Sequence, residues 1–489
     1  MAFTLDMTLL LAQMGPDKLE ILNQGTGLNG LIPDGPDRFN VFSVVSIFVG
    51  LVALGAYANA RFLKLPSAVG TMLSGIFFAL ILLALGDFEI VKIRTVKQLL
   101  DLYSSDIVLS LLLGVLLFAG AMQLDSKMVR RHRWSITYAA TLGTGISIAI
   151  TGCFVYWTLN WLNYITPENW DMKVGWGVSF LFAAVIAPTD PVAVMSILRR
   201  LKVKGAIKAY IAGESLFNDA TSIVVFLLIL QFWSKGTAGA GAASADTVID
   251  PSAAVVAMEF IWIAGGAVLL GLVTGSLGAY LVKTAKKKSL IVLLTVGIAL
   301  GTGGLADALG ISNAVAVTVA GIVFGQRRAD YIDSKDRPIH EFWKTIDNVV
   351  NPLFFALIGL ELLVVQWDVQ VAVASVVVFP VVICARYASL LIPWLASLGS
   401  TKMLKINHAG LVLMTWAGIR GGVSFALALS IPDYITSEFN DNSPIRPAFL
   451  LSTFIVVVLS VIIQGLTTEP VAKRLSKQLG NPNSKSTEA

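Results

Sequence analysis

Two short polar motifs interrupt long apolar stretches of this sequence, and the first of them, APTDP, begins at Ala187. Pro188 and Pro191 have no N–H group, so each leaves a carbonyl oxygen one helical turn earlier without its usual partner. These oxygens are expected beside the Thr189 hydroxyl and the Asp190 carboxylate. Small hard cations bind oxygen ligands of these kinds, which predicts an ion site. A proline kink with a satisfied aspartate is the structural alternative.

Four polar side chains fall within six residues of the next apolar stretch, which opens GESLFNDATSIVV. Ser215, Asn218 and Asp219 are spaced as i, i+3 and i+4, so a helix carries them on one face. Glu214 and Asp219 are five residues apart and point in different directions, which indicates different functions for the two carboxylates. Such a density of polar groups favours a binding site over simple helix-to-helix hydrogen bonding.

A second interruption lies near the end of the chain, in LVLMTWAGIRGGVSFALAL. The glycines around Arg420, including Gly421, let the backbone unwind at little steric cost. Interrupted helices at corresponding positions of two halves indicate a secondary transporter with an inverted repeat. The alternative is that these glycines only permit close helix packing.

The elements that must position these motifs are membrane helices. The chain has 489 residues, of which 56% are hydrophobic and 14% are charged, with a net charge of +5. A soluble protein of this size needs more charge to cover its surface, and the basic residues cluster in short loops rather than in a nucleic-acid-binding patch. The composition predicts an all-α polytopic membrane protein of about 13 spans. The expected spans are residues 42–61, 66–86, 106–123, 134–162, 174–198, 207–232, 256–282, 289–308, 312–326, 345–366, 369–398, 408–431 and 447–467.

Five ionisable side chains fall deep inside these spans, namely Asp190, Glu214, Asp219, Arg386 and Arg420. A charged group at a helix centre costs about 2.5–3.5 kcal/mol on insertion scales, so each needs a partner or a function. Six other acidic residues are expected nearer the span ends, within reach of water, and are set aside: Asp101, Asp106, Glu259, Asp307, Asp347 and Glu361.

The loops predict the orientation. If the even-numbered spans begin in the cytoplasm, most of the 36 Lys and Arg residues fall in cytoplasmic loops and the tail, as the positive-inside rule requires. The N-terminus is then outside and the C-terminus inside. We expect an external lead-in over residues 1–41, a transmembrane domain over 42–467 and a cytoplasmic tail over 468–489, with no soluble partner domain.

In matching order, APTDPVAV, GESLFNDATSIVV, ISNAVAVTVAGIVFG, NPLFFALIGLEL and AGIRGG resemble the NhaP/NHE-type sodium/proton antiporters of the cation/proton antiporter superfamily. The resemblance runs from about residue 42 to 467. It implies a homodimer embedded in lipid, with dimerisation helices beside a mobile core. It also implies an inverted-repeat fold in which two discontinuous helices, the fifth and twelfth spans, cross and move together.

The same resemblance assigns functions to single residues. It implies that Asp219 of the ND motif, preceded by Asn218, and Asp190 of the unwound helix bind the cation. It also implies that Ser215 and a carbonyl or hydroxyl oxygen of Thr189 are further ligands of this monovalent cation. It implies that Glu214 forms a structural ion pair with an arginine on a later helix, for which Arg386 is the best match.

One position departs from the family pattern. Some members carry a glutamate in the third span, in an LFEGGL-like motif, whereas this chain has LLFAGAMQL with Ala119 at that place. The site must work without that carboxylate, which leaves the preferred cation open.

Counting charges predicts the kind of exchange. If Glu214 neutralises Arg386, and Arg420 offsets one of Asp190 and Asp219, one negative charge remains. A bare charge is costly to move through a low-dielectric barrier, but a carboxylate that carries a proton or a cation is neutral. We therefore expect electroneutral exchange of one sodium (or lithium) ion for one proton, serving pH and salt homeostasis in a bacterial inner membrane. No cofactor is expected.

Three other functions stay open at this point. A potassium/proton exchanger on the same scaffold is the nearest alternative, because of Ala119. A membrane enzyme with an aspartate pair needs two carboxylates that share a proton, or a serine with a histidine, and no histidine lies deep in a span. A channel or receptor is not expected to show the charge count above. We predict a transporter and not an enzyme.

Overall fold

The structure is a computed structural model that describes residues 41–87, 106–124, 126–165, 175–190, 194, 195, 198, 205–239, 253–328, 333–363, 365–399, 407–432 and 445–479. Over these ranges the chain is helical and contains no β-strand. It divides into two compact units, Met1–Ala53 and Leu54–Ala489. The described part of the first unit consists of the N-terminal part of α3 (Val41–Ala58), and the site described below lies in the second unit.

Nine helical segments among the described residues are long and apolar enough to cross a membrane. Several combine two α-helices joined by one wide turn, as in α8 (Arg133–Tyr138) and α9 (Thr144–Ile165). The other segments of this kind are α13–α14 (Ala253–Phe260 and Gly266–Thr284) and α21–α22 (Arg446–Leu459 and Gly465–Leu479). A further segment consists of α3 and the wide turn Asn59–Leu63 that follows it. The continuous spans are α4 (Ser67–Asp87), α12 (Gly205–Gly239), α15 (Lys288–Ala308), α17 (Asp333–Leu360) and α18 (Val369–Gly399).

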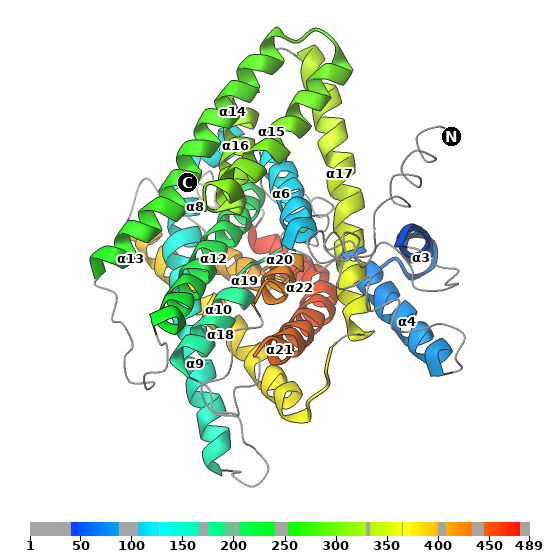
Figure 1. The fold of residues 1–489 in the computed structure, drawn as a ribbon, viewed down its shortest axis with the longest axis vertical. Coiled ribbons are helices and arrows are strands. Elements are labelled where there is room, and N and C mark those ends of the chain that lie inside the picture. Colours follow the sequence, from blue (N-terminus) through cyan, green and yellow to red (C-terminus); the bar gives the residue numbers. More distant parts are fainter. Residues whose placement is uncertain are drawn as a thin grey trace, which may run out of the picture. The chain divides into compact units, whose positions relative to one another are not determined.

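The remaining expected spans coincide with shorter helices. These are α6 (Asp106–Gln123), α10 (Trp176–Ile186), α16 (Asn313–Arg328) and the pair α19 (His408–Trp416) and α20 (Gly422–Leu429). The helices on each side of an interruption are short because the polar motif divides a stretch that is otherwise long enough to cross a bilayer. Figure 1 shows α10, α12, α19 and α20 together in the middle of the view.

Two sets of helices surround this centre. Helix α10 packs against α9, α12, α20 and α21, and its residues 181–187 are all buried in one apolar cluster. Helix α17 packs mainly against α4, α6 and α15, and more lightly against α20. Its contact with α4 is close, because a Cβ atom added to Gly75 would lie 2.2 Å from the Ala356 carbonyl oxygen.

One prediction about α17 is wrong. We expected Asp347 near the start of a span, within reach of bulk water, but α17 begins at Asp333 and places Asp347 well inside the helix, half-buried. The polar sequence DSKDRPIHEFWK conceals the helix start, because its residues lack the apolar character of a span. Glu361, which we also set aside, is only 6% exposed.

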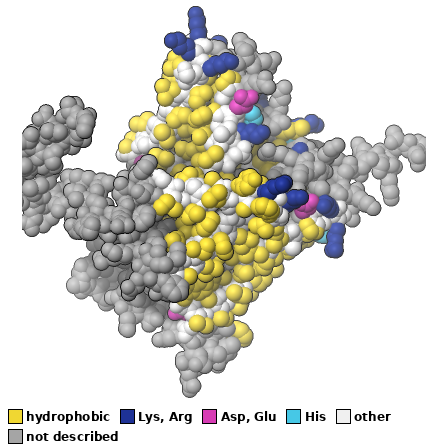
Figure 2. Space-filling view, turned by 90° about the vertical axis from the view of Figure 1, so that its right-hand side faces the viewer, with side chains coloured by type: hydrophobic (Ala, Val, Ile, Leu, Met, Phe, Trp, Pro, Cys, Tyr) yellow, Lys and Arg dark blue, Asp and Glu magenta, His cyan; other side chains and the backbone are white. Residues whose placement is uncertain are grey.

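The outer faces of the helices are apolar. On α14, Leu269, Val273 and Leu277 are each more than half exposed, and Leu293 of α15 is 66% exposed. Figure 2 shows hydrophobic side chains across the middle of one face, with Lys and Arg side chains toward its top and right-hand edge. Apolar patches of this extent indicate contact with lipid.

Candidate functional site: two interrupted helices and a carboxylate pocket

The two interrupted segments meet through their backbones. Helix α10 ends at Ile186 and α19 ends at Trp416, and beyond these ends the Asp190 N–H group donates to the Ile419 carbonyl over 2.7 Å. The pair forms an isolated antiparallel bridge. Gly421 permits this approach, because a Cβ atom there would lie 2.7 Å from the Cβ atom of Asp190.

Arg420 satisfies the carbonyl groups of the first interruption. Its Nη1 atom donates to the carbonyl oxygens of Ala187 and Pro188, the latter over 3.2 Å. The Asn218 amide also donates to the Ala187 carbonyl, over 3.1 Å. We expected the Ala187 carbonyl oxygen to be available to a cation, because residue 191 is a proline and has no N–H group to donate to it. Arg420 and Asn218 donate to this oxygen instead. Pro191 itself lies outside the described residues.

The second interruption is satisfied from another helix. The Arg420 N–H group donates to the Ser460 hydroxyl over 2.8 Å, and Ser460 donates to Gln464 over 2.5 Å. Gln464 in turn donates to the Trp416 carbonyl at the end of α19 over 3.3 Å. Sequence reasoning missed Ser460 and Gln464; their i, i+4 spacing in an apolar span was the available signal.

Polar side chains of α12 hold the first interruption in place. The Thr189 hydroxyl donates to the Ser215 hydroxyl over 3.1 Å and accepts from the Asn218 amide over 3.3 Å. The amide oxygen of Asn218 accepts hydrogen bonds from Thr144, over 2.7 Å, and from Ser222, over 3.3 Å. All of these residues except Thr144 and Thr189 belong to α12, so one helix face organises the unwound backbone.

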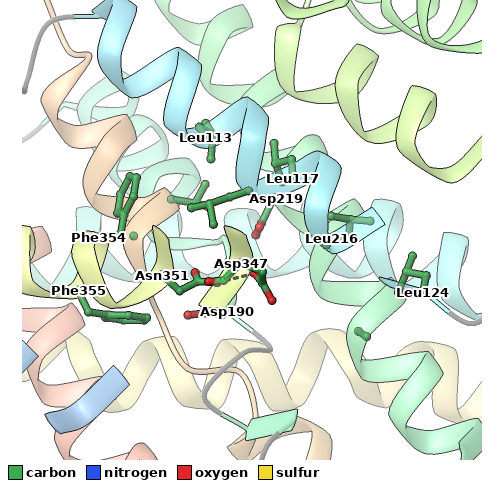
Figure 3. Close-up of a pocket in the computed structure, with 15 residues that line it drawn as sticks. Leu113, Leu117, Leu124, Asp190, Leu216, Asp219, Asp347, Asn351, Phe354 and Phe355 are labelled. Atoms are coloured by element: carbon green, nitrogen blue, oxygen red, sulfur yellow. Dashed lines mark hydrogen bonds between the residues drawn. The ribbon is translucent and has the colours of Figure 1, made fainter. Parts of the chain in front are cut away.

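Asp219 and Asp190 share a pocket of about 110 Å³ (Figure 3). Asp219 is 6% exposed and accepts a hydrogen bond from the Thr189 N–H group over 3.2 Å. The Asp190 carboxylate lies close enough to repel the charge of Asp219, and Arg420 lies close enough to attract it. Two like charges beside each other favour any occupant that brings positive charge.

The other predicted residues do not line this pocket. Thr189, Ser215 and Asn218 form the hydrogen-bonded layer on one side of Asp219. Glu214 is buried and accepts two hydrogen bonds from Arg386, over 2.6 and 2.5 Å, so its charge is compensated outside the pocket. The structure therefore brings Asp190 and Asp219 to one space and gives Glu214 a separate partner.

The pocket contains a third carboxylate that sequence reasoning set aside. Asp347 and Asn351 of α17 line the same space as Asp190 and Asp219, and Figure 3 shows them between the two aspartates. The missed signal is the i, i+4 spacing of Asp347 and Asn351 in IDNVVN, which places two polar groups on one helix face.

Ala119 does not reach the pocket. It is fully buried in an apolar cluster with Phe118, Phe324 and Trp343, whereas its neighbour Gly120 lines the pocket. At the place where the motif resemblance raised the possibility of a glutamate, this chain therefore has Ala119 in apolar packing.

Discontinuous helices that present carboxylates at membrane depth are the architecture of a secondary transporter. The chain matches the family described as "Sodium/hydrogen exchanger, transmembrane" over residues 49–474, and it belongs to this family. The resemblance found in the sequence motifs is confirmed at this level.

Individual proteins agree with this assignment. The chain is 32% identical to "Na(+)/H(+) antiporter NhaP" of Pseudomonas aeruginosa over 458 residues, which cover 91% of this chain and 99% of the relative. It is 29% identical to "Na(+)/H(+) antiporter NhaH" of Halobacillus dabanensis, over 87% of this chain and 95% of the relative. Among solved structures, the sodium proton antiporter MjNhaP1 of Methanocaldococcus jannaschii shares the fold, with a TM-score of 0.70 at 19% identity over 90% of this chain and 99% of that one.

Proposed function

We propose that this protein is a secondary antiporter that exchanges sodium or lithium ions for protons across a bacterial inner membrane, one for one. The observation that carries the proposal is the pocket in which buried Asp219 lies beside Asp190, at the meeting point of two interrupted helices. Family membership and the antiporter names of the relatives support the same function.

The arrangement of charges supports electroneutral exchange. Glu214 and Arg386 neutralise each other, and Arg420 lies near enough to offset part of the aspartate charge. One negative charge then remains on the pair of Asp190 and Asp219. A bare charge is costly in a low-dielectric barrier. The pair of Asp190 and Asp219 can therefore cross the barrier only when it holds a proton or a cation.

Each residue has a separate task in this mechanism. Asp219 carries the proton or the cation in turn, and Asp190 assists in binding the cation. Thr189, Ser215 and Asn218 keep the unwound backbone in the shape that positions both carboxylates. Arg420 and Gly421 hold the second interruption against the first.

The larger organisation is part of the proposal. We propose 13 spans, with the fifth and twelfth discontinuous and related by an inverted repeat, and a homodimer in the membrane. The domain limits are those expected above, with the lead-in over 1–41 outside and the tail over 468–489 in the cytoplasm. The asymmetry of Lys and Arg between the two sets of loops supports this orientation.

Reconstituted vesicles test the function. With a pH-sensitive dye inside, sodium, lithium and potassium are added in turn, with and without an imposed voltage. We expect sodium or lithium to drive proton movement that does not depend on voltage, and Asp219→Asn to abolish it. Glu341→Gln, which removes an exposed carboxylate on α17, is the matched control. Persistent exchange in Asp219→Asn would refute the assignment.

A potassium/proton exchanger is the second candidate. The observation in its favour is Ala119, which is buried in apolar surroundings where some relatives carry a glutamate. The same vesicles decide between the candidates, since a preference for potassium over sodium at equal concentration selects the second.

A further inference from the structure

Asp347 belongs to a different wall of the pocket from the two proposed carrier carboxylates. Asp219 lies on α12 and Asp190 lies in the interruption after α10, whereas Asp347 lies on α17. Helix α17 is packed against α4 and α6, and its contact with α4 is close at Gly75 and Gly359. Asp347 thus belongs to a wall built chiefly from α4, α6 and α17, which touches the interrupted helices at α20.

Amide groups hold the Asp347 carboxylate in position. The Gln123 amide of α6 donates to one carboxylate oxygen over 3.0 Å, and the Asn351 amide donates to the other over 2.6 Å. An ionised carboxylate accepts at about four lone-pair positions. These two amide donors fill two of the positions and fix the orientation of the Asp347 carboxylate.

The pocket around Asp347 is strongly acidic. Its described lining contains three carboxylates and no Lys or Arg side chain. A low-dielectric cleft lined by one sign of charge concentrates ions of the opposite sign. The pocket also extends to Leu124, past the end of α6 that faces the cytoplasm in the proposed orientation.

We propose that Asp347 is a cation-capturing residue, which sets the affinity for sodium on the cytoplasmic side and does not carry the exchanged charge. The inference rests on the proposed function and adds a specificity-determining residue to it. Because α17 packs chiefly against α4 and α6 and only lightly against α20, we take the charge of Asp347 to stay out of the one-for-one count.

Everted membrane vesicles provide the test, because they present the cytoplasmic face to added sodium. We expect Asp347→Asn to raise the half-saturating sodium concentration about tenfold, the effect of losing one favourable contact of ordinary strength. The saturating rate should stay within about twofold of wild type and remain independent of voltage. Asp347→Glu should keep the half-saturating concentration near the wild-type value, and Glu341→Gln should leave it unchanged.

A second variant keeps the test decisive if Asp347→Asn does not fold. Gln123→Met removes the orienting amide but keeps the carboxylate, and we expect a smaller rise, of about threefold. An unchanged half-saturating concentration in the folded variants overturns the proposal. So does loss of exchange at every sodium concentration, which would make Asp347 a carrier. Failure of the proposed function is distinct, because wild-type vesicles would then show no sodium-driven proton movement.

Discussion

Arg386 donates one hydrogen bond to each carboxylate oxygen of Glu214, over 2.6 and 2.5 Å, in the interior of the helical domain. Both residues are at most 5% exposed. This bidentate contact compensates the buried charge of Glu214, which neither water nor lipid can reach or neutralise. It also explains why a glutamate next to the proposed site does not compete for its cation.

The first prediction concerns the stability of this pair. Glu214→Gln leaves the Arg386 guanidinium buried without its counter-charge, which costs about 3–5 kcal/mol in comparable cases. We expect a lower unfolding temperature in detergent, followed by the fluorescence of the 11 tryptophans. The double exchange Glu214→Arg with Arg386→Glu should recover part of the loss. No recovery would mean that the pair contributes through its exact orientation rather than its charge.

The second prediction concerns the contact between the interruptions. Gly421→Ala adds a Cβ atom 2.7 Å from Asp190 Cβ and 3.2 Å from one of its carboxylate oxygens. Asp190 must shift, and overpacking of this kind costs about 1–3 kcal/mol. We expect weaker sodium binding in vesicle assays. Gly304→Ala is the matched control, since an added Cβ atom there meets nothing within 4 Å; equal behaviour of the two variants would contradict the prediction.

The third prediction separates charge from hydrogen bonding at Arg420. Arg420→Lys keeps a positive charge and a donor for the Ala187 and Pro188 carbonyls, whereas Arg420→Leu leaves these oxygens short of a partner. We expect partial exchange activity in the lysine variant and none in the leucine variant. Rates from the pH-dye assay, normalised to the amount of folded protein, provide the comparison. Full activity in the leucine variant would remove Arg420 from the charge count.

The sequence predicted the features that local chemistry determines. Broken helices follow from Pro188 and from the glycines around Arg420, since these residues alter the backbone wherever they occur. The positions of Asp190 and Asp219 followed from motif spacing. Apolar composition likewise indicated helices with lipid-facing surfaces.

Tertiary contacts were beyond reach of the same reasoning. Nothing in the sequence indicates that Arg420 donates a hydrogen bond to the Ala187 carbonyl, because only the packing of α10 against α20 brings the two residues together. Asp347 was set aside because its helix begins with polar residues, which hide its true start. Its place in the pocket depends on how α17 packs against α6.

The fourth prediction concerns pH. Partial burial and the neighbouring charge of Arg131 lower the pKa of His132 below its ordinary 6.5. The fold therefore favours neutral His132, and this residue destabilises the protein as the pH falls below 6.5; its effect disappears above that value. We expect His132→Gln to leave the pH profile of exchange between 7 and 8.5 unchanged. A displaced profile in this window would identify His132 as a pH sensor.

The fifth prediction concerns orientation. After replacement of Cys153 and Cys384 by serine, a single cysteine is introduced at Lys286, between α14 and α15. The proposed orientation places this loop in the cytoplasm. An impermeant maleimide should label it in everted vesicles and not in intact cells. Trp367, an exposed residue before α18, provides the opposite control when replaced by cysteine. Labelling of both sites from one side would reject the orientation.

The backbone bridge between Asp190 and Ile419 has a mechanical consequence. Together with the hydrogen bond from Arg420 to the Ala187 carbonyl, it joins the segment that follows α10 to the segment that precedes α20. A displacement of either segment must then carry the other segment with it, unless these hydrogen bonds break. Because these hydrogen bonds join the two segments, we expect Asp190 and Arg420 to keep their relative position if either segment moves.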